Sequence, residues 1–182
     1  TVTAGTFQDA ALNVTVDTLT INGGTLDADG GGNLVVNGDL TFSSGTLLAP
    51  LTGKIFSVTG NFNQSAGTLT PGTGTITMNG TATGKTFRAT STLNVLTVNG
   101  VGGSWTVTTT GVTVSTLNLT AGTFNLGVGL TSTVSTAISA SAGATLEFNT
   151  GTLSYGGATF DISVLGTLTP GTGTLIFTRT SA

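Results

Sequence analysis

Small polar residues alternate with Val, Ile, Leu and Phe along most of the chain. Apolar pairs at positions i and i+2 recur, for example Leu40 with Phe42 and Leu117 with Leu119. Such alternation is typical of β-strands, in which successive side chains point to opposite faces. Strong helix formers are scarce, because only one Met and four Lys or Arg residues are present. The pattern therefore predicts an all-β fold.

A triplet of Gly, Thr and a large apolar residue recurs along the whole chain. The residue before the apolar one is Thr in eight copies and Ser in one, and the residue before that is Gly in seven, the exceptions being Lys85 and Ala144. The apolar residue of each triplet is here called a marker, and successive markers are 18 to 22 positions apart. The markers are Phe7, Leu26, Leu47, Leu69, Phe87, Trp105, Phe124, Leu146 and Leu168.

A period near 20 residues predicts one coil of a parallel β-solenoid, because it is too long for a hairpin and too short for a βαβ unit. Each coil would hold about three short strands joined by tight turns. Four Asn-Gly pairs and two Pro-Gly pairs offer corner positions with positive φ: Asn22-Gly23, Asn37-Gly38, Asn79-Gly80, Asn99-Gly100, Pro71-Gly72 and Pro170-Gly171. We expect a single solenoid domain over 1–182 with about nine coils, its markers stacked as one core ladder.

Two segments carry a resemblance to a known group of proteins. The stretches GTLTPGTGTITMNG at 67–80 and GTLTPGTGTLIF at 166–177 resemble repeats of bacterial extracellular parallel β-helix proteins. These repeats are similar in style to autotransporter passenger regions and filamentous-haemagglutinin-like adhesins. The resemblance implies secretion, display at the cell surface and a role as stalk or fibre, and it supplies no catalytic motif.

Composition excludes several function classes. Only 6% of residues are charged, against about 25% in an ordinary domain. There is no Cys or His, which removes disulfides, His-based triads and the usual zinc sites. A net charge of −3 argues against a nucleic-acid partner, and without a run of 18 apolar residues no membrane insertion is expected. The mean hydropathy of +0.38 argues against a disordered chain.

The acidic residues are scattered, so we expect a non-enzymatic protein. Solenoid enzymes need clustered carboxylates on one face of the rod. The densest polar group is Asp27, Asp29 and Asn33 around three glycines, which resembles part of a calcium-binding loop but lacks the closing Glu. The group therefore suggests calcium as a cofactor, and the other interpretation is a solvated Gly-rich corner.

Three further features each leave two interpretations open. Lys85 and Arg88 flank Phe87 in the least regular repeat, as a contact point for a polyanion or as a solvated edge. Trp105 stands at a marker position and is expected in the core rather than as a platform for a sugar, whereas Tyr155 is left undecided. A Thr two residues after the hydroxyl residue of the triplet, as an ice-binding array would need, occurs in only three of nine copies, and the other interpretation is that Thr suits an exposed strand face.

The ends of the repeat suggest a function. The first marker lies close to Thr1, the last coil runs almost to Ala182, and no amphipathic helix or charged, Pro-rich segment covers either end. Uncapped coils of low charge should pair end to end and form a filament. We therefore expect a structural subunit of an extracellular filament or surface array whose partner is a second copy. The second hypothesis is a stalk or adhesin segment of a larger secreted surface protein, and the third is an ice-binding solenoid.

Overall fold

The chain forms a parallel β-solenoid. The computed structural model describes residues 1–179, which wind through about eight turns of about 21 residues each. All strand pairs are parallel, so the predicted fold class is confirmed, and the number of turns is close to the nine expected. The described part contains no helix, and hence none long and apolar enough to cross a membrane.

The strands lie on three faces that run along the rod, which we call faces 1, 2 and 3. Face 1 consists of β2 (Val14–Val16), β4 (Leu34–Val36), β6 (Ile55–Val58), β9 (Thr75–Met78) and the central parts of β11 (Leu93–Val107), β12 (Thr113–Asn125) and β13 (Thr131–Glu147). Face 2 consists of the first parts of β3 (Leu19–Asp27) and β5 (Leu40–Leu48), then β7 (Phe62–Gln64), β10 (Lys85–Arg88), the last parts of β11 to β13, and β15 (Thr167–Thr169).

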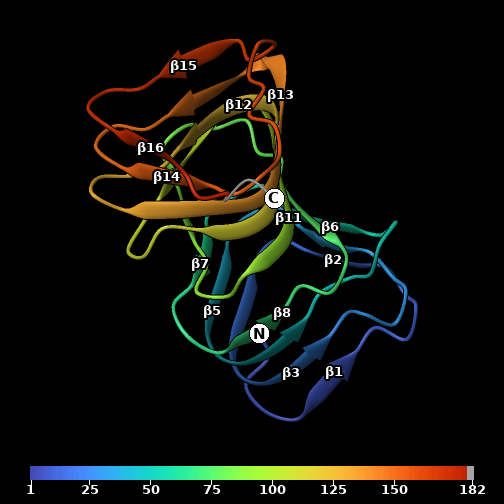
Figure 1. Cartoon of the computed structure of the whole chain (residues 1–182). Helices are drawn as coiled ribbons and strands as arrows, with labels where there is room; N and C mark the ends of the chain where they lie inside the picture. The colour runs from blue at the N-terminus through green and yellow to red at the C-terminus, as the bar shows by residue number, and fades with distance from the viewer. Residues whose placement is uncertain (180–182) are drawn as a thin grey trace.

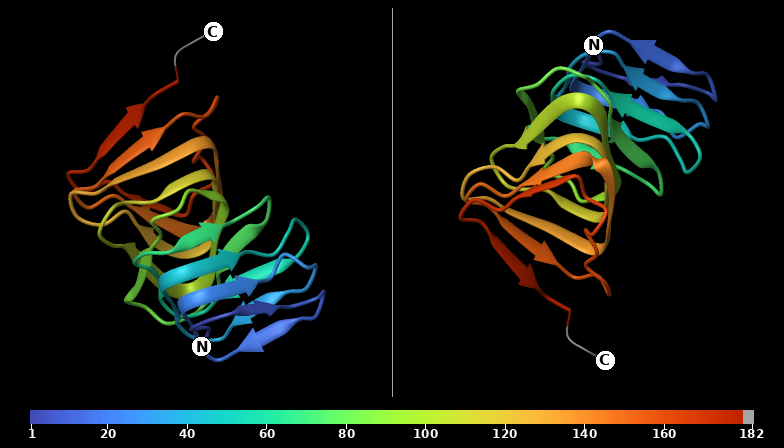
Figure 2. Two further views of the ribbon diagram at one scale, coloured as in Figure 1. Left: turned by 90° about the horizontal axis from the view of Figure 1, so that it is seen from below. Right: turned by 90° about the horizontal axis from the view of Figure 1, so that it is seen from above.

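Face 3 completes each turn. It consists of β1 (Thr6–Gln8), the last parts of β3 and β5, β8 (Thr68–Thr70), the first parts of β11 to β13, β14 (Thr152–Tyr155) and β16 (Thr174–Phe177). Long strands such as β13 therefore bend around corners, as Figure 1 shows. The turns follow one another in sequence order from one end of the rod to the other, so the first and last turns lie at opposite ends (Figure 2).

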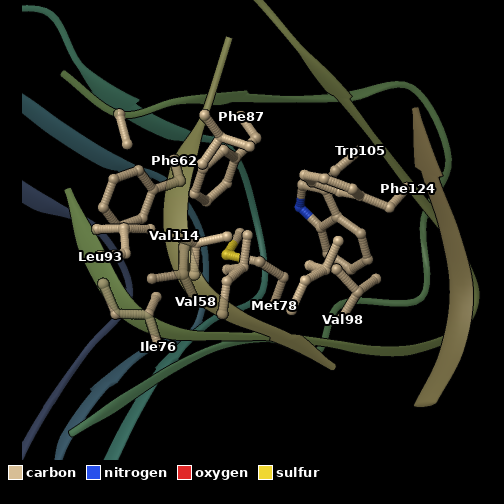
Figure 3. Close-up of a cluster of buried hydrophobic side chains, with 14 of the residues drawn as sticks. Val58, Phe62, Ile76, Met78, Phe87, Leu93, Val98, Trp105, Val114 and Phe124 are labelled. Atoms are coloured by element: carbon tan, nitrogen blue, oxygen red, sulfur yellow. The ribbon is translucent and has the colours of Figure 1, made fainter. Parts of the chain in front are cut away.

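The core fills the space between the three faces. Alternate residues of each strand point inward, and most of them are fully buried. Figure 3 shows Val58 and Met78 from face 1, Phe62 and Phe87 from face 2, and Val114 from face 3 meeting in this interior. The ring centroids of Phe62 and Phe87 lie 5.0 Å apart in a stacked pair. A narrow column of large side chains thus stabilises a chain that is otherwise rich in small residues.

The markers do not form one ladder of nine, and this prediction is corrected. Phe7, Leu26, Leu47 and Leu69 lie opposite one another on face 3. Trp105, Phe124, Leu146 and Leu168 form a second column on face 2. Phe87 belongs to neither column, because it lies opposite Phe62 and Val107 on face 2.

The marker triplet changes face because one corner is longer than the others. The corners between faces 1 and 2 at 37–39 and 59–61 have three residues, whereas the corner at 79–84 has six. After this longer corner the chain places its next triplet on face 2 rather than face 3. The projecting loop of each turn moves as well, from the corner that precedes face 1 to the corner that precedes face 3.

The expected Asn-Gly corners are present, but positive φ explains only some of them. Gly23, Gly72 and Gly171 have φ values of 114°, 56° and 55°. Gly38, Gly80 and Gly100 do not have positive φ. They are required for space instead, since a Cβ atom on Gly80 would lie 1.8 Å from the carbonyl oxygen of Thr59 in the preceding turn.

Candidate functional site

The first turn leaves an apolar hollow of about 180 Å³ open at its end of the rod. Its lining residues are Thr1, Val2, Phe7, Val14, Val16, Leu19 and Leu26. Phe7 is 49% exposed, whereas Leu26, the next marker in the same column, is 2% exposed. The difference arises because β1 pairs with β3 on one side, and no described strand covers its other side.

The last turn exposes the same kind of side chain at the opposite end. Leu168 is 41% exposed and Phe177 is 61% exposed, although the residues that precede them in their columns, Leu146 and Tyr155, are buried. Phe177 packs edge-to-face against Phe160 and Tyr155, with ring centroids 5.7 Å and 6.2 Å away. Strands β15 and β16 each pair on one side only among the described residues. Both ends therefore combine unpaired strand edges with inward-type apolar residues.

A buried glutamine holds the molecule together where the marker changes face. In face 3, β8 pairs with β5 but not with β11. Gln64 is fully buried and bridges this gap: its Oε1 accepts hydrogen bonds from the backbone N–H groups of Thr90 and Ser91, at 3.0 and 3.1 Å. Its Nε2 donates to the Ser91 Oγ at 2.8 Å and to the Gly67 carbonyl at 3.3 Å. All the polar atoms of this amide are thus satisfied.

Lys85 lies inside the rod beside Trp105, and neither interpretation of Lys85 as a surface cation holds. Its side chain is 9% exposed, and its Nζ donates to the Ala82 carbonyl and lies 4.7 Å from the centroid of the Trp105 ring. Burial lowers the pKa of Lys85 below its usual value.

Trp105 is fully buried, as expected, and its Nε1 donates to the Gly60 carbonyl at 3.0 Å. Tyr155, left undecided from the sequence, is also buried.

Of the candidate calcium residues, Asp27 and Asp29 interact with each other, whereas Asn33 bonds to other partners. Asp27 accepts hydrogen bonds from Gln8 Nε2 at 3.0 Å and from the Asp29 backbone N–H at 3.3 Å. The adjacent Asp27 carboxyl, chiefly by a side-chain hydrogen bond, raises the pKa of Asp29. The Asn33 Oδ1 instead accepts from the Ile55 backbone N–H at 2.9 Å. Residues 1–179 contain no group of three acidic side chains positioned to hold a metal ion. Calcium binding stays a prediction, which unfolding temperatures with and without Ca²⁺ would check.

Asp9 is a buried acid that sequence reasoning did not single out. It is 2% exposed, one carboxylate oxygen accepts from the Ala11 backbone N–H at 3.2 Å, and the other has no hydrogen-bond partner. It lies under the glycine run, since a Cβ atom on Gly30 would be 2.4 Å from its Oδ1. The signal was its position two residues after the marker Phe7, which alternation places inward.

The residues that follow the markers do not form an ordered hydroxyl array. One column contains Gln8, Asp27, Leu48 and Thr70, and the other contains Thr106, Asn125, Glu147 and Thr169. Asp27 and Leu48 interrupt the first column, and Asn125 and Glu147 interrupt the second. Ice binding stays a prediction without support from these columns, and a thermal hysteresis assay would check it.

Comparison of the chain with protein-family models, curated proteins and solved structures gives no match. The solenoid architecture implied by the resemblance to bacterial β-helix repeats is therefore shown by the coordinates alone, and membership of that group is not. Taken together, the two end turns are the part of the molecule best suited to a function.

Proposed function

We propose that the protein is a non-enzymatic structural subunit that assembles head to tail into an extracellular filament or surface array. The observation that supports this proposal is that both end turns expose apolar residues at positions that point into the core elsewhere in the rod. These residues are Phe7 at one end and Leu168 and Phe177 at the other. A second copy placed in line would bring β16 next to β1 on face 3 and would cover the apolar hollow of the first turn. Such a contact is heterologous and does not close, so it produces a filament.

Charge supports this arrangement. The first 39 residues contain no Lys or Arg and five Asp residues: Asp9, Asp17, Asp27, Asp29 and Asp39. The remaining residues carry Lys54, Lys85, Arg88 and Arg179 against Glu147 and Asp161, and the last turn has the exposed Arg179 and the exposed Asp161. A head-to-tail contact therefore brings the acidic first part of one copy toward a part of the next copy with the opposite net charge, and the rate of assembly should fall as salt concentration rises.

The substitution Phe7→Asp tests the end-to-end contact. It places a charge in the hollow, where the next copy would have to desolvate it without a partner, and we expect filaments to be lost. Negative-stain electron microscopy and light scattering over a concentration series measure this. Leu12→Asp is the matched control, because Leu12 is 70% exposed in a loop outside the hollow lining and its substitution should leave filaments intact.

Circular dichroism separates assembly from folding. Phe7→Asp should retain the β-sheet spectrum of the wild-type chain, since Phe7 lies in an end turn. Wild-type protein that stays monomeric at high concentration would contradict the proposal.

A stalk or adhesin segment of a larger secreted surface protein is the second candidate. The same exposed end residues favour it, because further coils of one polypeptide would cover Phe7 and Phe177 as well as a second copy would. If the chain is such a segment, it should not self-assemble, and added coils should raise the stability of the chain.

A further inference from the structure

The outer surface of face 1 carries no charged residue along its described strands. Its outward-facing residues form one row of Thr15, Val35, Ser57, Thr77, Thr97, Asn118 and Ser139, in which Ser57 is only 4% exposed, and a second row of Ile55, Thr75, Val95, Thr116 and Ala137. Face 2, by contrast, has Arg88 and Glu147 on its outer surface, and face 3 has Asp27. Rows of Thr also run along faces 2 and 3, but face 1 is the face whose described strands carry no outward charge.

The next row, at the corner between faces 1 and 2, extends this surface. Asn37, Thr59 and Asn79 stand there in successive turns, each with its backbone N–H bonded to the preceding turn. Asp17, in the first turn, is the charged residue that begins this row. Within the surface itself, Asn118 Nδ2 donates to Thr97 Oγ1 at 3.3 Å, so neighbouring side chains already satisfy one another in part.

We propose that face 1 is the surface through which filaments of this protein associate side by side, its partner being face 1 of a second copy. Lateral contact at the other faces would desolvate Arg88, Glu147 or Asp27, whereas contact at face 1 reaches a charge only at Asp17, at the end of the corner row. With a net charge of −3, copies repel one another weakly, and this repulsion is least between uncharged surfaces. The inference rests on the proposed filament.

The size of the surface explains why lateral contact needs a filament. Seven strands spaced about 4.8 Å apart, with three outward residues spanning about 13 Å, give about 400 Å² on each partner. A pair of single copies would bury about 800 Å² in total, which is below the roughly 1,200 Å² of a stable interface. Repetition of the contact along two filaments makes each further contact intramolecular, so association strengthens with length. Single chains should therefore not dimerise through face 1.

The test displays the full chain at high density on beads, in the Phe7→Asp background. Beads replace the filament as the source of multivalency, and Phe7→Asp removes the end-to-end contact, so the result does not depend on whether filaments form. We expect beads carrying the Phe7→Asp chain to cluster. Adding Thr97→Lys, at the centre of face 1, should abolish clustering because a lysine would have to be desolvated in the contact.

Two control variants fix the interpretation. Thr123→Lys changes net charge equally but lies on the outer surface of face 2, between Ser104 and Thr145, and should leave clustering unchanged. Thr97→Val keeps face 1 uncharged and β-branched and should also leave it unchanged. Absence of clustering in the Phe7→Asp chain, or equal losses in Thr97→Lys and Thr123→Lys, would overturn the proposal. Failure of the wild-type chain to form filaments, with bead clustering retained, would overturn the proposed function and leave face 1 as a surface for self-association of single chains held at high density.

Discussion

At the residue scale, close contact between successive turns explains the glycine that begins the marker triplet. In six of the seven copies that have this glycine, a Cβ atom would come within 3.0 Å of an atom in a preceding turn. For Gly45 the nearest atom is the Gly24 carbonyl oxygen, 2.4 Å away. The exception is Gly5, which meets nothing within 4 Å because no described turn stacks on that side of it. The repeated glycine is thus required by stacking.

The substitution Gly45→Ala should separate stacking from backbone strain. Gly45 has φ of 86° and no space for a Cβ atom, and we expect a loss of about 2–4 kcal/mol in the free energy of unfolding. Gly53→Ala is the control, since Gly53 has φ of 82° but nothing within 4 Å, and it should cost only about 1 kcal/mol. Urea unfolding measures both. Equal losses in the two variants would mean that φ, and not contact with the preceding turn, requires the glycine.

At the scale of elements, the change of face near residue 87 is the main irregularity of the solenoid. The nonapeptide GTLTPGTGT forms a strand, a turn and a strand at both of its positions, yet 67–75 leads from face 3 to face 1 and 166–174 leads from face 2 to face 3. The sequence of one corner therefore determines local conformation but not the face on which it lies. The length of the corner at 79–84 decides the face.

This distinction explains what the sequence could and could not predict. The period and the alternation predicted the solenoid and the stacking of Leu26 on Leu47 and Leu69, because these depend on local pattern. The transfer of Trp105 to another face depends on one long corner, which period counting averages out. The available signal was irregularity, namely Lys85 in place of Gly and two consecutive spacings of 18. Gln64 gave no sequence signal for its role, since its partners Thr90 and Ser91 lie in an irregular segment.

The substitution Gln64→Leu tests how the two parts of face 3 are joined. Leu has a similar volume and is apolar, so the core stays filled while the N–H groups of Thr90 and Ser91 lose their acceptor. We expect the free energy of unfolding to fall by about 3 kcal/mol. Asn63→Ala, in the same strand but facing outward, should change it by less than about 0.5 kcal/mol. Thermal or urea unfolding of both variants measures this, and a stability unchanged in Gln64→Leu would show that the bridge is dispensable.

At the scale of the whole molecule, stability should vary along the rod. Each turn of a solenoid contacts only its neighbours, so a central turn is stabilised on both sides and an end turn on one. Strands β11 and β12 each pair on both sides, whereas β1 and β16 pair on one side among the described residues. The amides of the end turns are therefore expected to open most easily, which gives assembly a local and measurable readout.

Hydrogen exchange at two protein concentrations provides that readout. In dilute solution we expect β1, β2, β15 and β16 to exchange fastest and β11 and β12 slowest. At concentrations where filaments form, protection should rise at β1 and β16 and stay constant at the centre, because only the end strands gain a pairing partner. In Phe7→Asp the end strands should exchange rapidly at every concentration. A uniform rise in protection along the wild-type chain would instead indicate association without strand pairing at the ends. End strands that exchange rapidly at all concentrations would favour the stalk, in which further coils of one polypeptide supply the missing partner.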